Sequence, residues 1–458
     1  MQQRADLTKG NIQKQMWQLA WPTMLSVFFY TLYNIVDTYW VSKLSADAIA
    51  AVSISQITLF LMISIGFGIT IGSGVLMSMD IGAKKIEGAE RILGQSFVLT
   101  AIAGSFFTLF ALVFRNELLT LSGATGNIFQ PAYDYFTITS GGSILFFVLI
   151  TIMFAFNAQG DTFTLTKLFA LSTLVNLVLD PLFIFGYGVI PAFGISGAAV
   201  ATLISQSIFI IIALITLSSV KRRIRFHPRH LRLRWASVKQ VLRIGIPAAL
   251  TQVINPIGLA AMTYIVGKEY HEAGAIAFSL GFRIEFFAYL PAVGYGFAAM
   301  AMMGQSIGAH NLDRAKKTLG VALRYATRIA LVMGGMAALF APQIIRVFTN
   351  DPLVTEYGLL YFRSVALSYV FLAAMMVEAN AFQAIGRSWP GFWIMFVRFI
   401  VVSIPLSILF STVLGYSILG VWIAVLLGNV VASILGYVWL MHTLKHFRFD
   451  VVDKAIVA

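Results

Sequence analysis

The segment "IGAKKIEGAERILG" at residues 81–94 returns as "IGAHNLDRAKKTLG" at residues 307–320, about 226 positions further along the chain. Nearly the same spacing relates "FNAQGDT" at 156–162 to "FQAIGRS" at 382–388. These matches indicate an internal duplication. We therefore expect the second half of the chain to adopt the same fold as the first half.

The composition places this duplicated chain in a membrane. Of its 458 residues 59% are hydrophobic and only 11% are charged, with a mean hydropathy of +0.85. A soluble domain carries about 25% charged residues, so a protein core could not absorb this much apolar surface. The apolar runs are continuous rather than alternating, which favours membrane helices over a barrel. The absence of cysteine excludes disulfides, thiolate chemistry and cysteine-bound zinc.

Twelve apolar runs are long enough to cross a bilayer, and six of them fall in each half. An even number of spans gives both halves one orientation, as in the parallel repeats of transporters. We predict an all-α integral membrane protein with two six-helix lobes, at 1–220 and 236–458, joined by a basic linker at 221–235. The predicted spans lie near 15–42, 48–79, 92–114, 132–157, 162–186, 194–219, 236–266, 273–306, 318–340, 358–383, 391–412 and 419–442.

The positive charges between the spans predict the orientation. One set of loops holds Lys84, Lys85, Arg91, Lys221, Arg222, Arg223, Arg225, Arg229, Arg232, Arg234, Arg314, Lys316, Lys317 and Arg387, whereas the opposite loops hold only Lys43, Arg115, Lys268 and Arg346. By the positive-inside rule, both termini are cytoplasmic. The expected location is the cell membrane, which is the inner membrane in a Gram-negative organism.

The densest basic run is "KRRIRFHPRHLRLRW" at 221–235. A long cytoplasmic connection that obeys the positive-inside rule explains it, and contact with anionic membrane lipids could add to that role. Nucleic-acid binding is not expected, because no recognition motif accompanies the charge.

The paired segments "MDIGA" and "QSIGA", the two six-span lobes and the basic linker resemble the MATE (multidrug and toxic compound extrusion) family over nearly the whole chain. "YNIVDT" in the first span and "NLVLD" in the fifth resemble its DinF-type branch, in which carboxylates of the N-terminal lobe are implicated in cation coupling. The resemblance implies a monomeric carrier without a cofactor. It would export small-molecule drugs, often organic cations, driven by inward H⁺ or Na⁺.

Four carboxylates fall well within the spans: Asp37, Asp180, Glu285 and Glu378. Each costs about 2.5–3.5 kcal/mol at the bilayer centre unless it has a partner, a cavity or a bound proton. Asp37 lies six residues before the outer end of its span, which places it ~9 Å inside the boundary. Asp180 lies six residues before the outer end of the fifth span, at a similar depth.

Amides and hydroxyls cluster at the same predicted depth. Asn34 and Asn176 precede Asp37 and Asp180 by three and four residues, so each amide shares a helix face with its acid. Other polar groups at this level are Tyr135, Thr139 and Thr202. One interpretation is that these groups only hold helices together. The other is a cation-coupling site, because two carboxylates in a poorly hydrated pocket cannot both ionise cheaply. Asp37, Asn176 and Asp180 could also ligate Na⁺ through their oxygens.

The second half offers an internal control. At the repeat offset Asp37 becomes Met262, Asn176 becomes Val402 and Asp180 becomes Leu406, while Tyr135 remains as Tyr361. A purely architectural role should have been kept in both lobes, so the asymmetry favours a functional site in the N-terminal lobe.

The C-terminal lobe departs from the NorM-type branch, which typically has acids in its seventh and tenth spans. Asn255 lies in the middle of the seventh span here, which argues against a NorM-like cation site. Glu285 is expected to find a partner in Arg363 or in the seventh span. Glu378 is expected to extend its carboxylate to the inner membrane surface.

Pro22 lies inside the first span, fifteen residues before Asp37. It predicts a kink, either static or acting as a hinge that bends when Asp37 gains or loses a proton. The alternative function weighed against efflux is flipping of lipid-linked oligosaccharides. That reading is weakened because basic residues within the spans are few. An enzyme is not expected, because the spans contain no catalytic motif.

Overall fold

The computed structural model describes residues 6–220 and 222–449, so Lys221 of the predicted linker lies outside the described residues. The described residues form helices and one isolated bridge, between Tyr187 and Ile190, and no β-strand. By length and composition alone, eight helices in the described part of the chain could cross a membrane, or up to ten if each bent pair counts as one span. The predicted all-α membrane fold is confirmed.

Each span predicted in the first half coincides with a helix or a bent helix pair. The predicted fourth span is α5 and α6, which meet at a bend of 49°. The elements in chain order are α1 (Ile12–Ser42), α2 (Ala46–Gly82), α3 (Ile86–Val113), α4 (Arg115–Leu121), η1 (Gly126–Ile128), α5 (Phe129–Gly141), α6 (Ser143–Ala158), α7 (Thr162–Phe185), α8 (Ile195–Ser218) and η2 (Pro228–Leu231).

The second half repeats this plan. Its first element, α9 (Trp235–Gly308), contains two predicted spans, which meet where Tyr270 and His271 leave the helical conformation. The remaining elements are α10 (Leu312–Leu339), α11 (Ala341–Phe348), α12 (Pro352–Ser364), η3 (Ala366–Ser368), α13 (Tyr369–Ala384), α14 (Trp389–Phe396), η4 (Val397–Ser403), α15 (Ile404–Ile408), η5 (Leu409–Val413) and α16 (Ile418–Lys445).

Polar side chains cap several helices after the short turns. Ser45 accepts a hydrogen bond from the backbone of Ala48 at the start of α2, and Asp161 accepts one from Thr164 at the start of α7. Asp351 does the same for the first turn of α12. These side chains satisfy backbone N–H groups that have no partner within the helix, which fixes where each helix begins.

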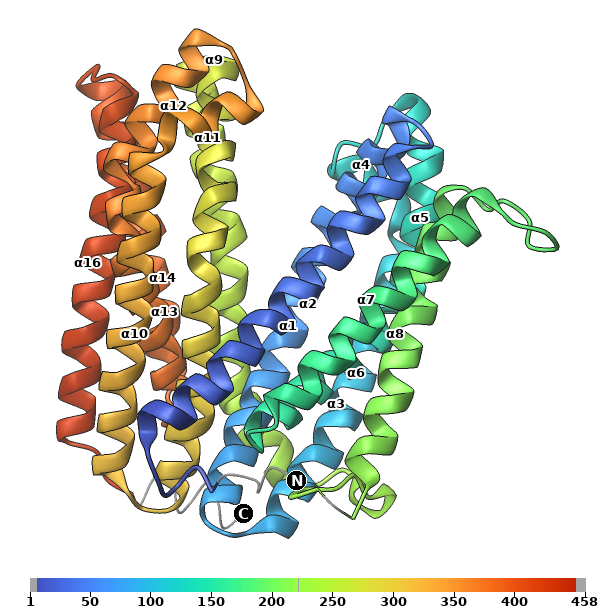
Figure 1. Cartoon of the computed structure of the whole chain (residues 1–458), viewed down its shortest axis with the longest axis vertical. Helices are drawn as coiled ribbons and strands as arrows, with labels where there is room; N and C mark the ends of the chain where they lie inside the picture. The colour runs from blue at the N-terminus through green and yellow to red at the C-terminus, as the bar shows by residue number, and fades with distance from the viewer. Residues whose placement is uncertain (1–5, 221, 450–458) are drawn as a thin grey trace. The chain divides into compact units, whose positions relative to one another are not determined.

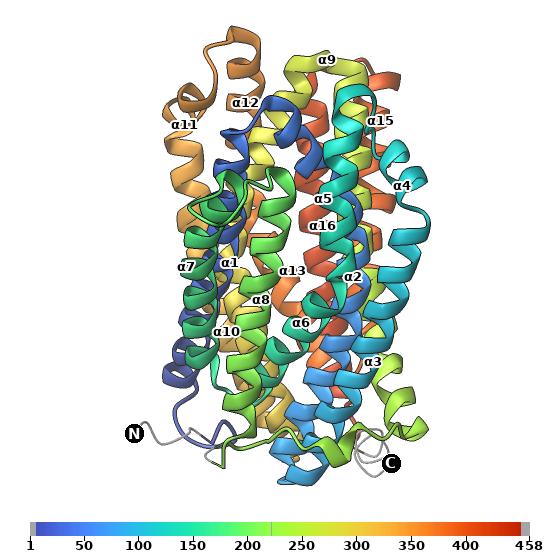
Figure 2. The same ribbon diagram turned by 90° about the vertical axis from the view of Figure 1, so that its right-hand side faces the viewer.

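The described chain forms two compact units. One contains Leu25–Ala249, and the other joins the chain up to Met24 to the chain from Leu250 onward. In the first unit α7 packs along α8, and α2 and α6 both pack against α3, as Figures 1 and 2 show. In the second, α13 packs between α10 and α16. The lobe boundaries at 1–220, 221–235 and 236–458 stay a prediction.

The chain passes between the units inside two helices. The boundary within α1 follows Met24, two residues after Pro22, and the boundary within α9 follows Ala249, two residues after Pro247. Each passage therefore lies next to a proline, which removes a hydrogen bond from the helix at that point.

Both ends of the described chain lie at the turn between α9 and α10. The Arg314 guanidinium donates to the carbonyls of Leu7, Lys9 and Gly10 at 2.8–3.0 Å. At the other end, the Phe449 ring lies 4.8 Å from the His310 ring. This placement agrees with an even number of spans. The assignment of this side to the cytoplasm stays a prediction.

Candidate functional site

The structure brings the two predicted carboxylates together within the unit at 25–249. Asp37 on α1 is 3% exposed and Asp180 on α7 is 0% exposed. The two side chains are close enough for the charge of one to act on the other. Pro181 follows Asp180 inside α7 and cannot donate a backbone hydrogen bond within the helix.

Three oxygens at this site have no hydrogen-bond donor among the described residues. Asn176 donates from Nδ2 to Asp180 Oδ1 at 2.7 Å. The other Asp180 oxygen, Asn176 Oδ1 and Asp37 Oδ1 are buried without a partner. Leaving a buried acceptor unpaired costs about 1–3 kcal/mol, so these acceptors suit a proton or a small cation.

Two tyrosines complete the cluster. Tyr135 on α5 is 4% exposed, and its hydroxyl lies within electrostatic reach of both acids. Tyr33 on α1 is 9% exposed and also lies within reach of both; its hydroxyl is near Thr202 but forms no well-aligned hydrogen bond. Sequence reasoning missed Tyr33, although it precedes Asp37 by four residues and therefore shares its helix face. It also missed Gln56 of α2, which lies beside Tyr135.

The other predicted members are peripheral. Asn34 is partly exposed, and its amide donates back to the Tyr30 carbonyl at 2.7 Å instead of facing Asp37. Thr139 donates to the carbonyl of Tyr135 in its own helix at 2.8 Å. Thr202 of α8 is half-buried next to Tyr33.

Glu285 in the other unit has a fixed cation beside it. The expected partner was Arg363 or a residue of the seventh span. The structure instead places the Arg398 guanidinium 3.6 Å from Glu285 Oε1, with both side chains buried. Tyr361 donates its hydroxyl to Glu285 Oε2 at 3.0 Å. Both carboxylate oxygens are therefore engaged, in contrast to Asp37 and Asp180.

Glu378 does not extend to the surface as expected. It is 1% exposed, and its Oε2 is buried against α16 at Gly436, where an added Cβ would lie 2.4 Å from it. This oxygen has no hydrogen-bond partner among the described residues. Packing of α13 against α16 at a glycine draws the side chain inward.

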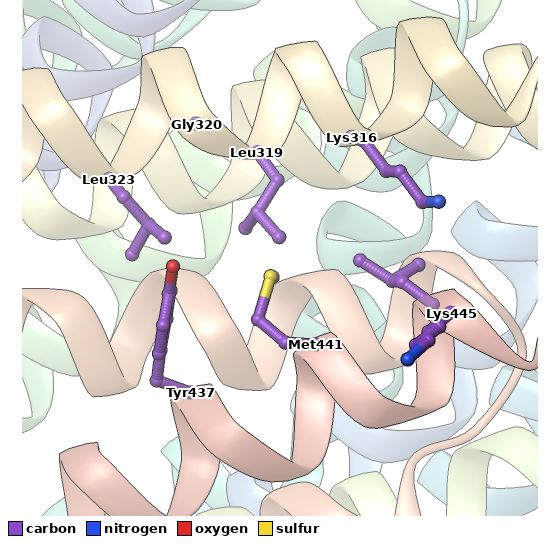
Figure 3. A pocket seen from close by; sticks show the side chains of 8 residues that line it. Lys316, Leu319, Gly320, Leu323, Tyr437, Met441 and Lys445 are labelled. Atoms are coloured by element: carbon purple, nitrogen blue, oxygen red, sulfur yellow. The ribbon is translucent and has the colours of Figure 1, made fainter.

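Two further observations on the described residues concern metal binding and the position of a cavity. No group of three or more His, Asp or Glu side chains could hold a metal ion there. A cavity of about 360 Å³ lies between α10 and α16, where Lys316 and Lys445 flank otherwise uncharged lining residues (Figure 3). It belongs to the second unit and contains none of the candidate carboxylates.

A helical membrane protein with a duplicated six-span unit has the architecture of a membrane transporter. The sequence model of the MatE family matches residues 22–182 and again residues 247–409. The chain belongs to the MatE family. The twofold match confirms the internal duplication, and membership makes the chain a transporter rather than an enzyme.

Relatives cover the chain almost from end to end. The FAD transporter of Shewanella oneidensis is 26% identical over 95% of this chain and 96% of its own length. A probable multidrug resistance protein NorM of Thermotoga maritima is 25% identical over 91% of this chain and 89% of its own length. A crystal structure of a MATE protein in the bent conformation is 25% identical, with a TM-score of 0.89 over 99% of this chain and 98% of that one.

Proposed function

We propose that this chain is a secondary active multidrug efflux antiporter of the DinF type. It exports organic, often cationic compounds in exchange for H⁺, as a monomer in the cell membrane with both termini in the cytoplasm. The observation that carries the coupling role is the contrast between the Asp37–Asp180 pair and Glu285. Asp37 and Asp180 keep unpaired oxygens in a buried site, whereas Glu285 is neutralised by Arg398.

The acid pair provides the exchange chemistry. Two adjacent buried carboxylates favour sharing a proton over being ionised together, and they titrate as a unit. The pair takes a proton when the site faces outward and releases it when the site faces the cytoplasm. Na⁺ is the second choice of coupling ion, because Asp37, Asn176 and Asp180 offer oxygens that could ligate it.

We assign the hinge of this cycle to Pro22. Support comes from the position of the unit boundary two residues after it, and from the equivalent arrangement at Pro247. A structural relative is described as a bent conformation. Bending of α1 at Pro22 would move Asp37 together with the helix that follows the proline.

A second candidate function is export of a nucleotide cofactor. The relative named an FAD transporter matches this chain over 95% of its length, so a flavin dinucleotide belongs among the test substrates. Flipping of lipid-linked oligosaccharides is less favoured, because a pyrophosphate group would need free cations within the membrane spans, and the buried Arg398 already faces Glu285.

The test is substrate uptake into everted membrane vesicles under an imposed pH gradient or an imposed Na⁺ gradient. The wild type should accumulate a fluorescent organic cation under the pH gradient, and Asp37→Asn and Asp180→Asn should not. Asp47→Asn is the matched control, because Asp47 is exposed in the same lobe. Wild-type transport by Asp37→Asn refutes the site, and uptake under the Na⁺ gradient alone refutes proton coupling.

A further inference from the structure

A second polar site lies outside the membrane spans, where the basic linker packs on α3. A cavity of about 410 Å³ is lined by Arg91 of α3, by Arg229 and His230 of η2, and by Arg232 and Arg234 just after it. Four arginines thus line one space. An ordinary positive-inside loop needs neither a cavity nor convergence of its charges.

A buried side chain holds the backbone of the linker segment that lines this cavity. Gln95 of α3 is 0% exposed, and its Nε2 donates to the carbonyls of His230 and Arg232 at 2.9 and 2.6 Å. Its Oε1 accepts from the Arg234 backbone N–H at 2.8 Å. One glutamine therefore positions the segment that carries three of the four arginines.

Close approach of the two backbones depends on Gly94. A Cβ atom at this position would lie 2.6 Å from the His230 carbonyl oxygen, so only glycine admits the linker here. One turn further along α3, the Phe97 ring packs on the Phe226 ring, with 5.2 Å between the ring centroids. The arginines are thus presented by a packed segment rather than by a loose loop.

Among the described residues, the four arginines have fewer acidic neighbours than positive charges. Glu87 lies 3.9 Å from Arg91 but is 68% exposed. Glu90 faces the linker on its other side, where it accepts from the Arg225 backbone at 3.0 Å and lies 3.6 Å from His227. Arg91 Nε is buried and has no hydrogen-bond partner among the described residues. Arg229 Nε donates to His230 Nε2 at 3.3 Å, so that imidazole is an acceptor and neutralises none of the positive charge.

The repeat supplies a natural comparison. Gly320 of α10 corresponds to Gly94, and no atom lies within 4 Å of the position its Cβ would take. The cavity at that place is mostly apolar, with Lys316 and Lys445 at its edges and no arginine (Figure 3). The arginine-lined form of the cavity therefore arises from the linker, which the second lobe lacks.

We propose that the pocket formed by Arg91, Arg229, Arg232 and Arg234 binds a phosphate group of an anionic ligand. Guanidinium forks match phosphate oxygens in pairs, and a preorganised cluster loses little freedom on binding. The pocket lies at the ends of membrane helices, where the phosphate can come from a lipid headgroup or from a soluble compound. The site is separate from the carboxylate pair and does not depend on the coupling ion.

The experiment measures thermal stability of the purified full-length chain in neutral detergent, titrated with inorganic phosphate, pyrophosphate or short-chain phosphatidylglycerol. Sodium chloride at matched ionic strength is the salt control. We expect saturable stabilisation of the wild type and an apparent Kd at least tenfold weaker for Arg232→Gln and for Arg91→Gln. Arg232 is exposed, so its replacement leaves folding intact.

Two controls remove one charge each elsewhere. Arg225→Gln lies in the same linker but outside the cavity, and Lys316→Gln lies in the repeat-equivalent cavity. Both should bind like the wild type. Stabilisation by phosphatidylglycerol alone assigns the site to a lipid headgroup, and stabilisation by pyrophosphate or phosphate as well assigns it to the phosphate itself. Equal binding by Arg232→Gln and the wild type, equal effects of sodium chloride, or no stabilisation by any phosphate compound would overturn the proposal.

Discussion

The Glu285–Arg398 pair allows a direct test of whether Glu285 has a structural role. The perturbation is a cycle of Glu285→Gln, Arg398→Met and the double variant. Glu285→Gln keeps an acceptor for the Tyr361 hydroxyl but leaves the buried guanidinium unpaired. Arg398→Met leaves the carboxylate with the Tyr361 bond alone. The double variant removes both charges.

The expected magnitudes follow from the burial of both partners. Glu285 is 5% exposed and Arg398 is 6% exposed, so removing either one strands an uncompensated charge at a cost of about 3–5 kcal/mol. Removing both is close to neutral, because the desolvation cost disappears together with the attraction. At about 2–4 °C per kcal/mol for a unit of this size, each single variant should lose roughly 6–20 °C in Tm.

Tryptophan fluorescence during thermal unfolding in detergent is a suitable assay. Trp422, one of eight tryptophans, is fully buried, and its ring centroid lies 5.1 Å from that of Tyr361, so part of the signal comes from beside this cluster. We expect the double variant to be more stable than either single variant. A double variant whose loss equals the sum of the two single losses would show that the charges do not stabilise each other.

Three further outcomes are expected. Gly94→Ala should destabilise the chain by about 1–3 kcal/mol, because the added Cβ would clash with the His230 carbonyl. Gly320→Ala should instead stabilise α10 by about 0.5–1 kcal/mol, because its Cβ would enter open space. Equal Tm shifts for the two variants would contradict this. Pro22→Ala should reduce efflux in the vesicle assay at unchanged expression, and undiminished efflux would rule out the hinge. Burial lowers the pKa of His230, so the unfolded chain binds more protons than the folded chain, and stability falls as the pH drops through ~6.5. His230→Gln should reduce the difference in Tm between about pH 7.5 and about pH 5.5. An unchanged difference would refute the assigned role of His230.

The spans were predictable because each apolar run must form its own hydrogen bonds in a bilayer, which leaves little choice beyond the helix. The sequence did not predict that two spans would follow each other within one element, α9. Only Tyr270 and His271 depart from helical geometry between these two spans. The packing of the linker depends on Gln95 and Gly94, which lie over a hundred residues away in sequence and carry no local signal.

Within the candidate site, depth along the helix was predictable and rotation about it was not. Asp37 and Asp180 lie within electrostatic reach of each other because equal distances from the helix ends give equal depth. The buried face of α1 runs through Tyr33, Asp37 and Val41, each four residues apart, and this rotation leaves Asn34 partly exposed. Likewise Arg398 lies in η4, a π-helical stretch whose wider turn changes the direction of its side chains, so helical spacing did not identify it as the partner of Glu285.

A tyrosine is kept at both repeat positions, but its charged neighbours differ between the two lobes. Tyr135 lies beside two acids with unpaired oxygens, while its counterpart Tyr361 donates to an acid that already faces a guanidinium. Each lobe thus retains a tyrosine next to a buried carboxylate, but the acids come from different helices. A carboxylate with a tethered cation can exchange a proton only by leaving that cation unpaired, at about 3–5 kcal/mol. Because one pH unit supplies only ~1.4 kcal/mol per proton, we expect an ordinary gradient to drive proton exchange at the proposed coupling site and not at Glu285.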